Sequence, residues 1–246
     1  MPSDADEPGA PSQDSLEQDS RVHHAPEPTS TPRDRRQLTW RRGEEPEFGR
    51  VAFFTDAVYA IALTLLVLDL HLPAMTGAED SPVVMWNALG DLTPKFVSFA
   101  VAFILIARYW VANHSFFTDI VRIDRRYLSL TALNLAGVAF LPFPTSLVGE
   151  YVENPISGVL FAVNLAFVSS TETLLLAHAH RARLMRSRLS DAAYRWQFIC
   201  SAEPAFMFLA TIPLAFIHPW VMLVSWIPIG MVVGHLLNRR KPDDAY

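Results

Sequence analysis

Eight polar side chains lie within long apolar stretches of this sequence, where a charge or an unpaired amide is costly. They are six ionisable groups and two amides: Asp56, Asp69, Arg108, His114, Glu172, Glu203, Asn134 and Asn164. In surroundings without water, such groups either hydrogen-bond one another between helices or relay protons and ions. Both chemistries need the groups to meet, so the next question is which elements position them.

Six apolar stretches carry these residues, each about as long as the roughly 20 residues that cross a bilayer as a helix. The stretches are Val51–Leu72, Pro94–Phe117, Tyr127–Leu147, Pro155–His178, Trp196–Ile217 and Pro219–Leu237. Helices are the expected form, because an open strand would leave backbone groups unpaired in lipid. The sequence therefore predicts an all-α, polytopic membrane protein with six transmembrane helices.

The polar groups fall at similar depths in these predicted helices. At a rise of 1.5 Å per residue, Asp56 lies ~9 Å from the start of its span, and Asn134 and Glu203 lie ~10 Å from theirs. We expect a structural network in which acids, bases and amides neutralise one another near one membrane face. The alternative is a proton or cation relay, which would consist of Asp56, Arg108, His114, Glu172 and Glu203.

Composition excludes several other classes of protein. Of the 246 residues, 51% are hydrophobic and 18% are charged, against about 25% charged in ordinary soluble domains. The net charge of −5 and the single cysteine, Cys200, argue against nucleic-acid binding by bulk charge and against a disulfide scaffold. The sequence contains no phosphate-binding loop, nucleophile elbow or zinc motif, so we expect no enzyme, no cofactor and no metal site.

The connections between the stretches alternate in charge and predict the topology. Residues 1–42 are polar and proline-rich and are expected to be a disordered tail, followed by a membrane domain over 43–238 and a short tail over 239–246. The N-terminal approach, the connections after the second and fourth stretches, and the C-terminus are rich in arginine, whereas the other connections are not. The positive-inside rule then places both termini in the cytoplasm of a multi-pass cell-membrane protein.

The first stretch also carries a narrow apolar stripe. At about 100° per residue, Leu65 lies near +40° and Leu68 near −20° from Ile61, while Asp56 points about 140° away, towards the other helices. Periodicity alone is equally compatible with a lipid-facing or a core surface.

The same stretch resembles the first helix of the bacterial TMEM175-like potassium channels. The family hallmark is an arginine, three residues and then Phe-Ser-Asp, and here Arg50 is followed by Phe54-Thr55-Asp56. Thr55 stands where the family usually has serine, which keeps the hydroxyl and adds a methyl. Further matches are listed here in chain order: Tyr109, Trp110, His114, Phe117, Asn134 and Leu141-Pro142-Phe143. The resemblance extends over about residues 47–237.

The resemblance implies a homotetrameric channel whose first helices line a central path for potassium. It places the hydrophobic constriction at Ile61, Leu65 and Leu68. It also implies an interhelical packing and hydrogen-bond network of Arg50, Phe54, Thr55, Asp56, Trp110, His114 and Asn134. The motif occurs once in the chain, so a closed ring needs other copies of the same chain. Its expected partners are then itself and membrane lipids, and no nucleic acid or other small-molecule substrate.

Two points stay open at this stage. Asp69, near the outer end of the first stretch, is either an interfacial carboxylate or part of a ring of negative charge that attracts cations. The alternative function is a proton- or cation-coupled secondary transporter that uses the buried charged layer. Transporters often carry broken helices at corresponding positions of two halves, whereas here we expect the prolines to cluster in the last two stretches and the charges near one face.

Overall fold

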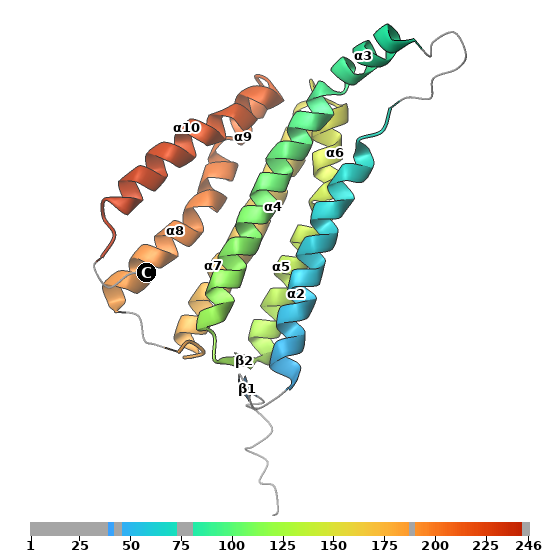
Figure 1. Cartoon of the computed structure of the whole chain (residues 1–246). Coiled ribbons are helices and arrows are strands. Elements are labelled where there is room, and N and C mark those ends of the chain that lie inside the picture. The colour runs from blue at the N-terminus through green and yellow to red at the C-terminus, as the bar shows by residue number, and fades with distance from the viewer. Residues whose placement is uncertain (1–38, 42–45, 73–80, 187–189, 243–246) are drawn as a thin grey trace, which may run out of the picture. The chain divides into compact units, whose positions relative to one another are not determined.

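The computed structural model describes residues 39–41, 46–72, 81–186 and 190–242, which form a helical bundle with one short β-ribbon (Figure 1). Most of the expected N-terminal tail lies outside the described residues. Its last part, Thr39–Arg41, forms strand β1, which the sequence did not predict.

Six helical segments of the described chain are long and apolar enough to cross a membrane, and they match the six predicted stretches. In chain order they are α2 (Pro46–Leu65) with the 3₁₀ turn η3 (Leu66–Asp69), α4 (Thr93–Asp119), α5 (Arg125–Phe140) with α6 (Pro142–Glu150), α7 (Pro155–Arg181), α8 (Asp191–Ala210) with α9 (Ile212–Ala215), and α10 (Pro219–Asn238). The chain is a multi-pass membrane protein, as predicted.

Proline explains where the third and fifth spans break. The third span divides at Leu141, because Pro142 follows it and Pro144 lies two residues further on; proline lacks a backbone N–H and clashes with the preceding turn. Breaks at proline are therefore not confined to the last two spans, contrary to what the sequence suggests. The fifth span divides at Thr211, two residues before Pro213. A short helix that the sequence did not predict, α3 (Pro82–Asp91), precedes α4 and is capped by the Ser81 hydroxyl.

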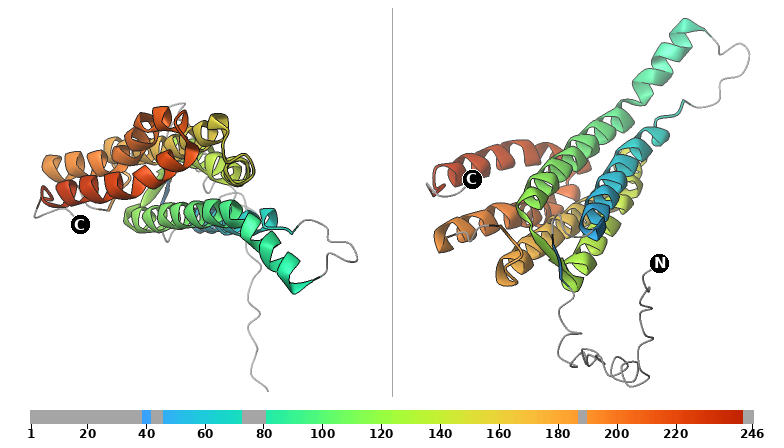
Figure 2. Two further views of the ribbon diagram at one scale, coloured as in Figure 1. Left: turned by 90° about the horizontal axis from the view of Figure 1, so that it is seen from above. Right: turned by 60° about the horizontal axis from the view of Figure 1, so that its bottom comes forward.

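Helix α7 is the centre of the bundle. It packs against α5, α6, α8, α9 and α10, and much of its buried surface consists of glycine, alanine, serine and threonine. Small side chains let helix backbones approach closely in lipid, where no hydrophobic force drives helices together. Helices α2 and α10 lie on opposite sides of this centre (Figures 1 and 2).

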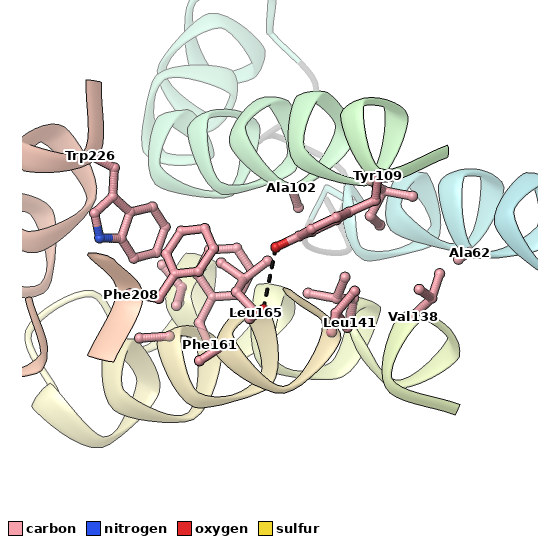
Figure 3. Close-up of a cluster of buried hydrophobic side chains, with 14 of the residues drawn as sticks. Ala62, Ala102, Tyr109, Val138, Leu141, Phe161, Leu165, Phe208 and Trp226 are labelled. Atoms are coloured by element: carbon pink, nitrogen blue, oxygen red, sulfur yellow. Dashed lines mark hydrogen bonds between the residues drawn. The ribbon is translucent and has the colours of Figure 1, made fainter. Parts of the chain in front are cut away.

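The main core joins α7 to every neighbouring helix (Figure 3). Phe161 of α7 and Phe208 of α8 both pack against Trp226 of α10, with ring centroids 5.8 and 4.8 Å apart, respectively. The hydroxyl of Tyr109 on α4 donates to the Leu165 carbonyl at 3.3 Å and lies 2.7 Å from the Ser169 hydroxyl. Aromatic packing and these polar contacts together fix α4, α8 and α10 against α7.

A second, smaller core closes one end of the bundle, where the arginine-rich connections gather. Strand β1 pairs antiparallel with β2 (Arg122–Asp124), and the amides of Val121 and Arg122 both donate to the Leu184 carbonyl. The Asp124 carboxylate caps α5 and lies 2.9 Å from His178 Nε2 on α7. The segment before α2 and the connections after α4 and α7 therefore meet at the same end.

Candidate functional site: the outward face of α2

The three side chains of the predicted constriction lie on an outward face of α2 and η3, which no other part of the described chain covers. Ile61, Leu65 and Leu68 are 58%, 41% and 70% exposed. The opposite face of the same helix is buried, with Thr55, Tyr59, Ala62 and Leu66 packed against α4, α5 and α6. The first span is thus divided lengthwise into a packed face and a free apolar face.

The end of this stripe differs from the expectation of one continuous α-helix. Residues from Leu66 to Asp69 form a 3₁₀ turn, in which side chains at i and i+3 eclipse each other. Leu68 therefore lies almost directly above Leu65, rather than ~60° round the helix from it. The tighter turn straightens the stripe and ends it at Asp69, which is half-buried.

Thr64 is a polar residue of the outward face that the sequence reasoning did not single out. Its side chain is exposed beside Ile61 and Leu65, and its hydroxyl donates to the Ile61 carbonyl at 2.8 Å. With its proton engaged, the oxygen keeps lone pairs that can accept from another donor or contact a cation. The signal was available in the spacing, because Thr64 lies about 60° from Ile61 on the helical wheel.

Asp56 points away from the stripe, as the periodicity predicted, and binds α4. Trp110 Nε1 donates to Asp56 Oδ1 at 2.9 Å, and the Trp110 and His114 rings lie 5.6 Å apart. Asp56, His114 and Thr55 line one cavity of about 290 Å³ between α2 and α4. The Thr55 hydroxyl is buried with no hydrogen-bond partner in the described part of the chain.

Two members of the expected network lie on the outward face of α2. Phe54 is 62% exposed on the outward face, about 20° from Ile61 on the helical wheel. Arg50 is also exposed, and within the described ranges no acidic group lies within ion-pair distance of it. Their shared face with the stripe explains this, since a side chain seven or eleven residues before Ile61 returns to the same side of the helix.

Asn134 ties three helices together. Its side-chain oxygen accepts from the Tyr59 hydroxyl of α2 at 3.4 Å, and its Nδ2 donates to the Val168 carbonyl at 3.2 Å and to the Thr171 hydroxyl at 2.9 Å, both on α7. Tyr59 was not predicted as a partner, although its position three residues after Asp56 places it on the packed side of the helix. This bridge holds the packed face of α2 to α5 and α7.

The charged groups that would make a relay do not line one cavity. Asp56 and His114 face the α2–α4 cavity, whereas Arg108 and Glu172 line a cavity of about 230 Å³ between α4, α7 and α8. Glu203 lines a third cavity, which it shares with Arg108. The expected single layer is thus split by α4, because residues 108 and 114 of that helix point to different sides. Within the described residues, no three His, Cys, Asp or Glu side chains are arranged to hold a metal ion.

Comparisons with known proteins show which proteins this chain is similar to. Residues 50–142 match the family described as "Endosomal/lysosomal potassium channel TMEM175". A potassium channel of Streptomyces collinus is 35% identical over 193 residues, which is 76% of this chain and 92% of that protein. The human protein named endosomal/lysosomal proton channel TMEM175 is 28% identical over 212 residues, covering 79% of this chain and 41% of that protein.

A solved structure has the same fold. The lysosomal potassium-selective channel TMEM175 homolog from Chamaesiphon minutus superposes with a TM-score of 0.66 at 26% identity, covering 79% of this chain and all of that one.

Proposed function

The chain belongs to the TMEM175 family, and we propose that it is a potassium channel whose pore is formed by the outward faces of α2 from four identical chains. The family and its bacterial potassium-channel relatives support the ion and the channel function. The observation that carries the pore assignment is the lengthwise division of α2. One face is packed and hydrogen-bonded within the chain, and the other leaves Ile61, Leu65 and Leu68 exposed in the described part of the chain.

A ring of such faces explains passive gated conduction. One α2 supplies one stripe, so a closed constriction needs several copies around a common axis. Rings of isoleucine and leucine can close a pore by excluding water, and they open it by separating. Permeation of K⁺ then needs no cofactor and no catalytic step, and the partners of the chain are its own copies and the surrounding lipid.

Discrimination between cations needs oxygen atoms that the apolar rings lack. Thr64 is the exposed hydroxyl among the constriction residues, with its proton engaged by the Ile61 carbonyl. A ring of these oxygens can replace part of the hydration shell of a cation, as pore carbonyls do in other channels. Asp69, the last residue of η3, would add negative charge at the outer mouth and raise the local cation concentration.

The charge pattern supports a topology with both termini in the cytoplasm. The arginine-rich connections after α4 and α7 meet β1 at one end of the bundle, and basic connections favour the cytoplasmic side. This topology places Arg50 at the inner and Asp69 at the outer end of the pore helix.

Cysteine accessibility tests the pore assignment. Leu65→Cys, made in a Cys200→Ala background, is reconstituted in liposomes and exposed to a charged thiol reagent during K⁺ flux. Flux should fall severalfold on modification, because a charged group would then occupy the constriction. The matched control is Leu209→Cys on α8, which is 48% exposed and should be modified without loss of flux. Unchanged flux in a modified Leu65→Cys channel contradicts the assignment.

Reversal potentials separate this channel from a coupled transporter. With opposed K⁺ and Na⁺ gradients, a channel gives a reversal potential set by the two permeabilities and insensitive to a pH gradient. A transporter with fixed proton stoichiometry gives one that moves with pH. Thr64→Val should shift the reversal potential towards equal K⁺ and Na⁺ permeability while leaving the assembly intact.

A further inference from the structure

A groove lies away from α2, between α4, α8 and α10. Its volume is about 700 Å³, within the range of sites that hold one small ligand. Its wall is mainly apolar, and α10 lines it from Leu223 to Asn238, a distance of ~22 Å at the rise of a helix. That length exceeds the ~15 Å depth of a single lipid leaflet, so an acyl chain can lie along it.

Two glycines keep the groove open. Gly230 and Gly234 of α10 both line it, and a Cβ built at either position would have no neighbour within 4 Å. The pair has the spacing that commonly brings two helices together, yet no helix of the described chain fills this space. The groove is therefore a vacancy in the packing of α8 and α10 rather than a tight helix contact.

The charges of the groove are unevenly distributed. Midway along it, Arg108 and Glu203 come from facing helices and carry opposite charges. At the end nearest the arginine-rich connections, Lys241 lies 5.9 Å above the ring of Trp196, which lines the groove and donates through Nε1 to the Leu237 carbonyl. Arg239 and Arg240 are exposed beside it. The mouth is thus cationic, whereas the interior carries a balanced pair.

The groove also faces away from the pore. Helices α8 and α10 lie on the opposite side of α4 and α7 from α2 (Figures 1 and 2). If the outward face of α2 lines a central pore, as proposed above, then this side borders lipid, and on this point the inference rests on the proposed function.

We propose that the groove binds one anionic phospholipid of the leaflet at the basic end, with an acyl chain between α4, α8 and α10 and the phosphate at Lys241 and its neighbouring arginines. The length and the apolar wall of the groove suit an acyl chain, and its basic mouth suits an anionic headgroup. A zwitterionic lipid would gain the same apolar contacts, but it would lack the net attraction of about fivefold in affinity that each cation near the surface supplies.

Lipid retention tests this proposal. The full-length protein is purified in mild detergent, loaded with phosphatidylglycerol or with phosphatidylcholine of the same acyl chains, and examined by native mass spectrometry. We expect one phosphatidylglycerol per chain, retained at least about fivefold better than phosphatidylcholine. Equal retention of the two lipids would overturn the assignment of the headgroup.

A second test fills the groove with side chains and measures whether the lipid still binds. Gly230→Leu with Gly234→Leu places two side chains in open space, so the protein should still fold. The amount of bound lipid should then fall to that of the protein to which no lipid was added. The matched control is Val232→Leu, which lies between the glycines in sequence, is 59% exposed and does not line the groove. Full retention in the doubly filled variant would overturn the site.

A third test removes one positive charge at the mouth of the groove, at a residue beyond the end of α10. Lys241→Gln, beyond the end of α10, should lower phosphatidylglycerol retention about fivefold and leave phosphatidylcholine retention unchanged. No effect of this change would contradict the placement of the phosphate. Because K⁺ flux is measured separately, loss of lipid with intact flux leaves the pore assignment standing, and loss of flux with intact lipid leaves the groove standing.

Discussion

Helices α7 and α2 are both apolar membrane spans, but they use their surfaces in opposite ways. Helix α7 buries residues all round its circumference, most of them small or hydroxyl-bearing. Helix α2 buries a single face and leaves its large aliphatic side chains outside. In lipid, apolarity alone does not distinguish a packed surface from a free one, because lipid tails are as apolar as leucine.

The difference lies in side-chain size and in hydrogen bonding. On α7, glycine, serine and threonine permit close approach, and the backbone and hydroxyls bind Asn134 and Tyr109 across the interfaces. On the outward face of α2, bulky residues recur and stay exposed among the described residues. A helix built like α7 organises its own subunit, and one built like α2 is completed by surfaces outside it.

The largest loss of stability should come from crowding α7. Gly137 lies on α5, and Gly137→Ala would place a Cβ 2.8 Å from Phe167 Cδ1 and 2.9 Å from Val168 Cγ2, both on α7. Overpacking of this kind lowers the free energy of unfolding by about 1–3 kcal/mol. Thermal unfolding in detergent should therefore occur at a lower temperature. The matched change Gly49→Ala on α2 meets no atom within 4 Å and should be neutral or stabilising. Equal effects at the two glycines would remove the contrast between the helices.

A smaller loss should follow from removing the amide that joins the two helices. Asn134→Leu keeps the volume but leaves the Thr171 and Tyr59 hydroxyls without this partner, at a cost of about 1 kcal/mol. Tyr59→Phe removes only the 3.4 Å contact and should cost less. A double-mutant cycle between the two positions measures the interaction free energy of Tyr59 and Asn134. Additive losses would show that Tyr59 and Asn134 act independently.

The smallest effect on folding should come from the stripe itself. Ile61→Ser changes a 58% exposed side chain, so the free energy of unfolding within one chain should change by less than about 0.5 kcal/mol. Potassium flux should nevertheless rise, because a hydroxyl wets the constriction. A large loss of subunit stability with unchanged flux would mean that this face packs rather than conducts.

Much of the fold could be predicted from sequence. The six spans follow from length and apolarity, and the orientation of Asp56 towards the other helices follows from its angle to Ile61. The 3₁₀ turn at Leu66 and the split of the charged layer could not be predicted in this way. The split depends on how α4 is rotated, since Arg108, which faces α8, and His114, which faces α2, lie ~1.7 turns apart on that helix.

The candidate site was predicted only in part. Spacing located Ile61, Leu65 and Leu68, but it did not show that Phe54 shares their face or that Tyr59 would meet Asn134. Strand β1 and helix α3 escaped prediction because three-residue pairings and short surface helices have too little periodicity to be read. Long apolar segments can be predicted from the sequence. The rotation of these helices relative to one another cannot, because it is set by packing.

The change from α to 3₁₀ winding at Leu66 means that a local change of winding would move Leu68 relative to the rest of the first span. The two windings differ by ~20° of rotation and ~0.5 Å of rise per residue, so rewinding this turn as α-helix would swing Leu68 by ~60° about the helix axis and draw it inward along that axis. If four chains surround a pore as proposed above, rewinding all four turns would move the ring of Leu68 side chains out of line with those of Ile61 and Leu65.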